Sequence, residues 1–132
     1  MRITVSTALL MTAAMLPATS AQEASGTLAK IAETGTIALG HRDSSLPFSY
    51  YDDQQQVVGY AMDLCYHIAD AVQAHLGLET LNIELVPETP ATRIPLLTNG
   101  TIDLECGSTT NNVERQTQVA FTTTHYVVSP RF

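Results

Sequence analysis

The chain has 132 residues, a formal net charge of −7 and only 6 lysines and arginines, so it has room for one domain of ordinary size. This acidic balance argues against nucleic acid or an anionic lipid surface as a partner. A hydrophobic fraction of 45% with 14% charged residues is typical of a folded domain and not of an acidic disordered tail. A site for an anion would therefore depend on very few arginines.

The first segment has the features of a targeting signal. Arg2 is followed by a mostly apolar stretch up to Pro17, and small residues then lead to a cleavage site after Ala21. The apolar stretch is shorter than the roughly 20 residues that a membrane span requires. We therefore expect residues 1–21 to be a cleaved signal peptide and residues 22–132 to be a mature chain located in the periplasm.

Hydrophobic spacing and capping residues predict the elements that follow. The first is a helix over 28–34 that Thr27 caps and Gly35 ends, followed by a buried strand over 36–40 and a polar loop over 41–47. Residues 48–51 and 57–60 then predict a β-hairpin or an extended excursion, and a helix runs from Asp63 to its stop at Gly77. They continue with a strand over 81–86, a helix that Thr89-Pro90 opens and that runs through Leu97, a strand over 102–106, a short helix around Glu114-Arg115, and late strands over 119–121 and 126–128.

The alternation of strands and helices predicts an α/β fold, with a mainly parallel sheet and helices on both faces. In such sheets ligands bind beyond the carboxyl ends of the strands. Arg42 follows the first strand, residues 90–93 follow the second, and residues 107–110 follow the third. The sequence thus predicts that its unusual polar residues gather at one edge of the sheet.

Two cysteines, Cys65 and Cys106, remain in the expected mature chain. Export to an oxidising compartment permits a disulfide between them, but sequence spacing does not show whether their Cα atoms come within bridging distance. A disulfide and two buried thiols therefore both stay open. The spacing matches no metal-binding motif, and we expect neither a metal nor a cofactor.

Three stretches of the mature chain stand out: GHRDSSLPFSY at 40–50, RIPLLTNGTID at 93–103 and ECGSTTNNVER at 105–115. They resemble, in the same order, motifs of the glutamate/aspartate periplasmic binding proteins of ABC transporters, within the family 3 extracellular solute-binding proteins. The resemblance implies a periplasmic binding protein-like II (venus flytrap) fold that closes two lobes on one amino acid. It implies that this chain, from about Thr27 onward, supplies the first lobe and that the second lobe is absent.

Whether the chain is a fragment or a truncated gene stays open. The implied protein is a monomer that delivers its ligand to an inner-membrane ABC permease.

The resemblance also implies which residues hold the ligand. Arg93 would bind the α-carboxylate and Arg42 the side-chain carboxylate of glutamate or aspartate, because a guanidinium pairs bidentately with a carboxylate and stays charged. The alternative is that both are solvated surface charges. Ser108, with Thr109 and Thr110, precedes a short helix, whose start favours an anion, although an ordinary helix cap would look the same. One departure from the family is Pro90, where the family often has a serine; proline offers neither a hydroxyl nor an N–H.

Two other functions fit the same fold. Some of its members are periplasmic dehydratases of cyclic amino-acid precursors, which need a placed general acid or base. Asp103 and Glu105 are the obvious carboxylates near the expected edge, but no known catalytic pattern includes them, and we assign no catalytic residue. An amino-acid sensor domain would use the same site chemistry as a transport protein. Product formation from prephenate or arogenate would identify the enzyme, and a downstream membrane helix would favour the sensor.

Overall fold

The computed structural model describes residues 26–129, so the signal peptide predicted at residues 1–21 lies outside the described range. The elements in chain order are α1 (Thr27–Thr34), β1 (Thr36–His41), β2 (Ser44–Ser45), β3 (Ser49–Tyr51), β4 (Val57–Val58), α2 (Tyr60–Leu76), β5 (Asn82–Pro87), α3 (Arg93–Thr98), β6 (Leu104–Cys106) and α4 (Val113–Gln116). None of the helices in the described part of the chain has both the length and the apolar character needed to cross a bilayer.

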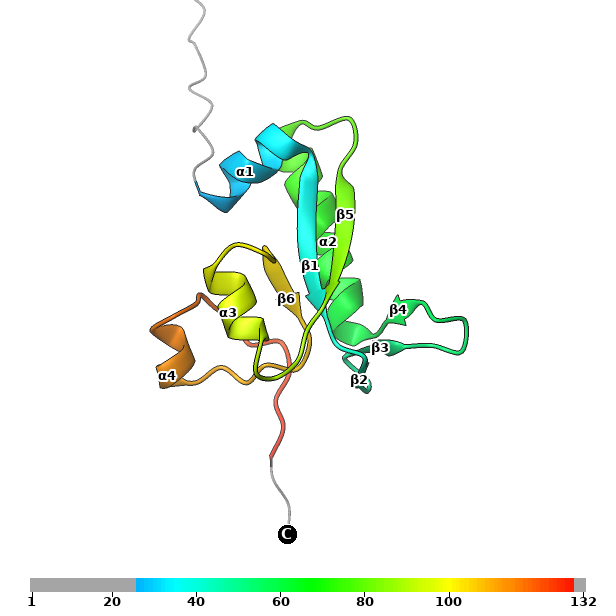
Figure 1. Cartoon of the computed structure of the whole chain (residues 1–132), viewed down its shortest axis with the longest axis vertical. Coiled ribbons are helices and arrows are strands. Elements are labelled where there is room, and N and C mark those ends of the chain that lie inside the picture. Colours follow the sequence, from blue (N-terminus) through cyan, green and yellow to red (C-terminus); the bar gives the residue numbers. More distant parts are fainter. Residues whose placement is uncertain (1–25, 130–132) are drawn as a thin grey trace, which may run out of the picture.

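A three-stranded parallel sheet forms the centre of the fold, with β1 lying between β5 and β6 (Figure 1). β1 pairs with β5 along its whole length, from Thr36 opposite Asn82 to His41 opposite Pro87. The shorter β6 pairs only with the last part of β1. The predicted α/β fold with a parallel sheet is confirmed, and the carboxyl ends of all three strands meet at one edge.

Alternate residues of β1 point to opposite faces of the sheet, as the pleat requires. Ile37 and Leu39 face α2 and form the hydrophobic core. Their partners in this core come from α1, α2 and β6: Ile31, Met62, Cys65, Ala69 and Cys106. Gly40 lies on the other face, where a Cβ atom would come within 2.5 Å of Ile102 Cδ1. The sheet therefore has helices on both faces, with α1 and α2 on one and α3 on the other.

The start of α2 differs from its prediction. The helix begins at Tyr60, three residues before Asp63, and ends as expected with Gly77 in the left-handed conformation. The first N–H groups of a helix need acceptors, and those of Tyr60 and Ala61 donate to the carbonyls of Pro47 and Phe48, at 2.9 and 2.8 Å. These acceptors come from a distant turn, so local capping rules do not reveal them.

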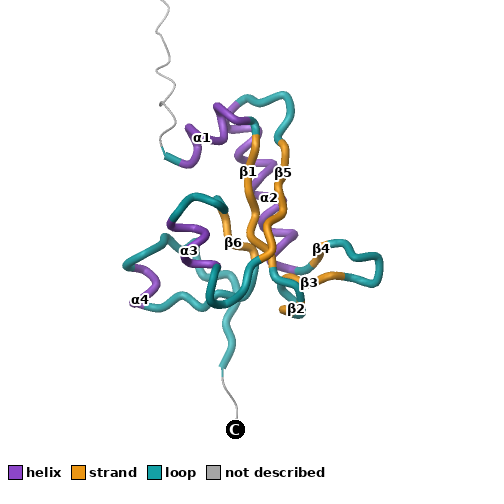
Figure 2. The backbone as a smooth tube through the Cα atoms, in the orientation of Figure 1, coloured by secondary structure: helices purple, strands orange, loops and turns teal. Residues whose placement is uncertain are grey.

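Three further predictions are wrong in detail. α1 ends at Gly35 as predicted, but Thr27 is its first residue and makes no side-chain cap. α3 begins at Arg93 rather than at Thr89-Pro90, because residues 89–92 form a separate hydrogen-bonded turn. Residues 119–128 form a loop that pairs with no strand in the described range, so the two late strands are not formed (Figure 2).

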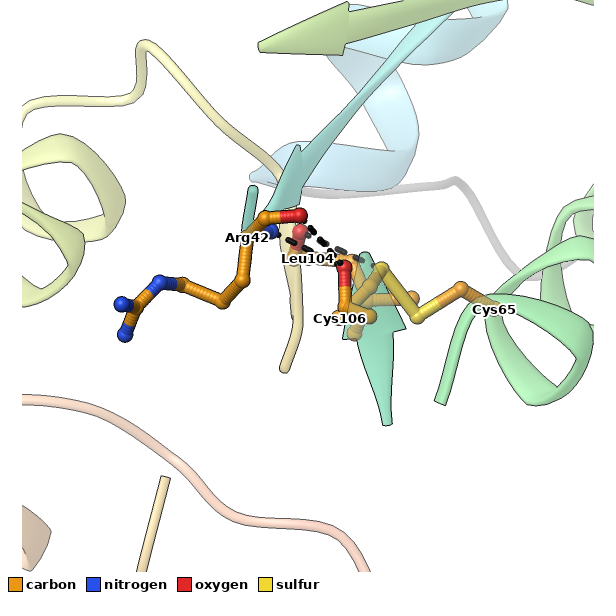
Figure 3. Close-up of a disulfide and its surroundings, with 5 residues drawn as sticks. Arg42, Cys65, Leu104 and Cys106 are labelled. Atoms are coloured by element: carbon orange, nitrogen blue, oxygen red, sulfur yellow. Dashed lines mark hydrogen bonds between the residues drawn. A yellow bond between two sulfur atoms is a disulfide. The ribbon is translucent and has the colours of Figure 1, made fainter. Parts of the chain in front are cut away.

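The structure resolves the question left open for the cysteines. Cys65 of α2 and Cys106 of β6 form a disulfide, with their Cα atoms 6.1 Å apart (Figure 3). This separation lies in the usual range for a disulfide. The bond ties the short edge strand β6 to the central helix, directly beside the residues that follow β6.

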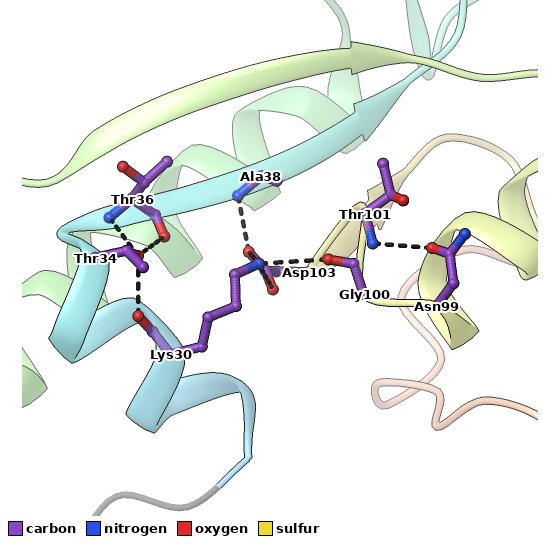
Figure 4. A network of polar contacts seen from close by, with 8 residues as sticks. All are labelled: Lys30, Thr34, Thr36, Ala38, Asn99, Gly100, Thr101 and Asp103. Atoms are coloured by element: carbon purple, nitrogen blue, oxygen red, sulfur yellow. Dashed lines mark hydrogen bonds and ion pairs between the residues drawn. The ribbon is translucent and has the colours of Figure 1, made fainter.

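Asp103 holds the start of β6 against the sheet (Figure 4). Its carboxylate accepts the Ala38 N–H at 2.9 Å and pairs with Lys30 Nζ at 2.8 Å. The Asp103 side chain is only 4% exposed, whereas that of Lys30 is 42% exposed. The buried hydrogen bond from the Ala38 N–H to Asp103 should therefore contribute more to stability than the ion pair between Asp103 and the exposed Lys30.

We expect Asp103→Ala to lower the free energy of unfolding by about 2–3 kcal/mol, because the Ala38 N–H loses its acceptor in a buried setting. Lys30→Met should cost less than about 1 kcal/mol, as is usual for exposed ion pairs. Urea denaturation of both variants measures the difference. Equal losses in the two variants would show that the ion pair, and not the backbone contact, supplies the stability.

Candidate functional site

Arg42 leaves the carboxyl end of β1 and is held in place through its backbone. Its N–H donates to the buried hydroxyl of Ser49 in β3, at 2.9 Å. The side chain points away from the Cys65–Cys106 disulfide (Figure 3) and passes Gly107, where an added Cβ would lie 3.0 Å from Arg42 Cγ. Gly107 thus permits the close packing that brings Arg42 next to the segment after β6.

Arg93 is the first residue of α3 and is only 7% exposed. Its N–H donates to the carbonyl of Thr89 at 3.1 Å. The hydroxyls of Thr89 and Thr92 lie 3.1 Å apart and bond across the same turn. Both arginine side chains lack partners within residues 26–129. The buried Nε atoms of Arg93 and Arg42 have no hydrogen-bond partner there, and no ion pair joins either guanidinium to a carboxylate.

Ser108 lies in the segment after β6, and its hydroxyl oxygen is 2.8 Å from that of Ser45 in β2. The contact joins β2, which follows β1 in the chain and belongs to a second, antiparallel sheet of β2, β3 and β4, to the segment that follows β6. Thr109 has a buried hydroxyl without a partner among the described residues, whereas Thr110 is exposed and its carbonyl accepts from Arg115 Nη1 at 2.8 Å.

The expectation that these hydroxyl residues stand at a helix start is wrong. α4 begins at Val113, and its cap is Asn112, whose side chain accepts the Arg115 N–H at 2.9 Å. Ser108 is therefore neither the cap of α4 nor a member of its first turn. Any anion contact from Ser108 would come from its own hydroxyl and loop backbone, without the helix dipole.

Glu88, which follows β5 directly and is 3% exposed, is not among the residues predicted for the site. Its N–H donates to the carbonyl of His41 at 2.9 Å, which extends the pairing of β5 with β1. Its carboxyl packs over Gly40, with Oε2 3.1 Å from where a Cβ of that glycine would lie. The available signal was its position, because an acidic residue directly after a strand falls on the predicted ligand edge.

Glu88 lies near Glu105 and the two arginines. Burial, followed by the negative charge of Glu105, raises the pKa of Glu88 to about 8 against the opposing attraction of Arg93 and Arg42. Neither Glu88 oxygen has a hydrogen-bond partner in the described residues, and Glu105 Oε1 is also buried without one. A buried carboxyl without such partners favours its neutral form.

A cavity of about 870 Å³ lies between α2, β6 and residues 119–128, and it shares Ser108, Thr109 and Thr110 with the predicted site. Its walls include apolar residues of α2 such as Leu64 and Ile68, and they also include residues 107–111. Neither Arg42 nor Arg93 lines it. A bound carboxylate would pair with the guanidiniums. We therefore place the candidate anion site not in this cavity but at the edge of the sheet that carries Arg42, Glu88 and Arg93, which we call the arginine edge.

Comparison with known proteins places the chain among bacterial binding proteins. It is 54% identical over 125 residues to the glutamate/aspartate import solute-binding protein of Escherichia coli strain K12, covering 94% of this chain and 41% of that protein. Among solved structures, the arginine-bound form of domain 1 from TmArgBP of T. maritima matches with a TM-score of 0.65 at 27% identity, over 76% of this chain and 72% of that one. An ancestral amino-acid-binding protein, described as a precursor of cyclohexadienyl dehydratase, matches with a TM-score of 0.61 at 29% identity, over 70% of this chain and 37% of that one.

The chain spans about two fifths of the length of the Escherichia coli relative. Residues 37–132 match the family described as bacterial extracellular solute-binding proteins, family 3. This match includes all three sequence motifs and every residue of the arginine edge described above. The chain therefore belongs to the family 3 bacterial extracellular solute-binding proteins.

Proposed function

We propose that this chain is the first lobe of a periplasmic, monomeric protein that binds glutamate or aspartate and delivers it to an inner-membrane ABC permease. Arg93 carries the proposal: the residue is 7% exposed, its buried Nε has no partner, and no ion pair neutralises its guanidinium within the described residues. A largely buried cation without an ion-pair partner is unfavourable, and a ligand carboxylate would supply the missing charge and acceptors.

A second guanidinium supports an acidic ligand in particular. Arg42 stands on the neighbouring strand end, and like Arg93 it lies near enough to Glu88 to lower the pKa of that carboxyl. An acidic amino acid has two carboxylates, which match two guanidiniums. The curated Escherichia coli relative is named for glutamate and aspartate import, which agrees with this ligand class. We assign Arg93 to the α-carboxylate and Arg42 to the side-chain carboxylate, with Ser108, Thr109 and Thr110 beside them.

Isothermal titration calorimetry of the full-length gene product tests the ligand class. We expect L-glutamate and L-aspartate to bind at least about 100-fold more tightly than L-glutamine, because the amide removes one charge-assisted pair with a guanidinium. L-arginine is the second comparison, since a structural neighbour is an arginine-bound form. Equal or tighter binding of L-glutamine or L-arginine would reject an acidic amino acid as the ligand.

Binding, rather than catalysis, is the activity that we propose. The Escherichia coli relative is named a solute-binding protein, whereas the structural neighbours include both an ancestral amino-acid-binding protein and an ancestral cyclohexadienyl dehydratase. Incubation of the protein with prephenate or arogenate should yield no product. Turnover of either compound would establish the enzyme alternative.

A further inference from the structure

A pair of serine hydroxyls joins the segment after β6 to β2. Ser45 Oγ lies 2.8 Å from Ser108 Oγ, although the two residues are 63 positions apart in the chain. Outside the pairing of the strands, no backbone hydrogen bond of Ser108 or Thr109 is found within residues 26–129. The contact with Ser45 is also the one hydrogen bond that the Ser108 side chain makes in this range. The position of the Ser108 hydroxyl therefore depends on Ser45.

Ser45 itself is fixed through its backbone. β2 pairs with β3 so that Ser45 lies opposite Ser49, and the Ser45 carbonyl accepts the Phe48 N–H at 2.7 Å. Ser49 is fully buried, and its hydroxyl accepts the Arg42 N–H at 2.9 Å. The paired strands β2 and β3 thus hold the backbone of Arg42 and, through Ser45, the hydroxyl of Ser108. Two of the proposed ligand contacts therefore share one support.

The two hydroxyls define the direction in which hydrogen bonds are donated when a carboxylate binds. A carboxylate only accepts hydrogen bonds, whereas a hydroxyl has one hydrogen to donate and two acceptor positions. Once Ser108 donates its hydrogen to a ligand carboxylate, its contact with Ser45 requires that Ser45 donate to Ser108. Bonds in such a chain polarise one another, so a hydroxyl that accepts one hydrogen bond donates a stronger one.

We propose that Ser45 is a positioning residue of the anion site, which holds the Ser108 hydroxyl in place and donates to it while Ser108 donates to the ligand carboxylate. This inference rests on the proposed function, in which Ser108 contacts the ligand. Ser45 acts on the ligand only through Ser108. Because Ser108 is exposed and water can replace a lost partner there at little cost, the contact should matter for binding more than for folding.

Calorimetry with L-glutamate on variants of the full-length gene product tests the Ser45 hydroxyl. Ser45→Ala should weaken binding by about five- to tenfold, the usual contribution of one hydrogen bond, while the urea midpoint of unfolding stays unchanged. Ser45→Thr keeps a hydroxyl and should bind within about threefold of the wild type. A residue that only packed would give the reverse order, because threonine adds a methyl group and alanine stays small. Unchanged affinity in Ser45→Ala would overturn the proposal.

A double-mutant cycle tests whether Ser45 acts through Ser108. Adding Ser45→Ala to the Ser108→Ala protein should change the L-glutamate affinity by less than about twofold, because the hydroxyl that Ser45 positions is already gone. An undiminished loss in that background would overturn the assigned route. Ser44→Ala is the matched control: Ser44 is the exposed neighbour in the same strand, and alternate residues of a strand face opposite sides. Its affinity should equal that of the wild type.

A measurement without ligand separates the failure of this inference from the failure of the proposed function. The ¹⁵N relaxation of the full-length gene product gives the order parameter of the Ser108 amide on the picosecond-to-nanosecond timescale. This order parameter should fall in Ser45→Ala and not in Ser44→Ala. An unchanged value in Ser45→Ala would overturn the positioning role whatever the ligand is. If the value falls but the wild type binds neither L-glutamate nor L-aspartate, the proposed ligand is wrong while the support of Ser108 by Ser45 stands.

Discussion

Replacement of Arg93 by methionine is expected to reduce L-glutamate affinity by at least about 100-fold. Arg93 is 7% exposed and its guanidinium has no ion-pair partner in the described chain, so a bound carboxylate would be its principal acceptor. Loss of one partner of a buried, charge-assisted pair typically costs about 3 kcal/mol or more, which corresponds to this factor. Methionine retains an apolar stem of similar reach, so the loss should concern binding more than packing. Calorimetry measures the affinity, and circular dichroism verifies that the variant is folded.

Two comparison variants separate the possible causes of this loss. Lys30→Met removes a positive charge at a position away from the arginine edge, where Lys30 pairs with Asp103, and should leave the affinity within about threefold of the wild type. Arg42→Met should weaken L-glutamate binding strongly and L-glutamine binding much less, because we assign Arg42 to the side-chain carboxylate. The preference for L-glutamate over L-glutamine should therefore fall. An Arg93→Met protein that binds as tightly as the wild type would remove Arg93 from the site.

Removal of the Cys65–Cys106 disulfide is expected to lower the free energy of unfolding by about 2–4 kcal/mol. The two cysteines are 41 residues apart, and closing a loop of that length restricts the unfolded chain by about 4 kcal/mol in the chain-entropy description. The native state also loses the link between α2 and β6, and β6 pairs only with the end of β1. The double variant Cys65→Ser/Cys106→Ser, unfolded in urea, gives the difference.

Reduction of the wild type provides the matched test of this prediction. A reducing agent should bring the wild type close to the stability of the double-serine variant and should leave that variant unchanged. Because Glu105, Gly107 and Ser108 adjoin Cys106, we also expect weaker L-glutamate binding without the bond. A double-serine variant as stable as the oxidised wild type would show that the packing of β6, and not the cross-link, holds this strand in place.

Much of the sheet was predictable because its signals are local. The buried run at 36–40 and the alternating run at 81–86 correspond to β1 and β5, and glycines end α1 and α2 where expected. The α2 start was not predictable, because its first N–H groups bond to carbonyls of a separate turn. The segment over 119–128 has the composition of strands, but strand formation needs a partner edge, and none pairs with it in residues 26–129.

The amino-acid sequence by itself determined the order of strands and helices, and through that order the placement of Arg42, Arg93 and residues 107–110 beyond the carboxyl ends of a parallel sheet. Hydrophobic periodicity and glycine stops act over a few residues, so they survive without tertiary information. Tertiary structure alone decided that Cys65 bonds to Cys106 and that Glu88 is buried near the two arginines. Both arrangements bring together segments that are separate in the chain, and their proximity depends on the strand order and the helix packing that only the assembled fold defines.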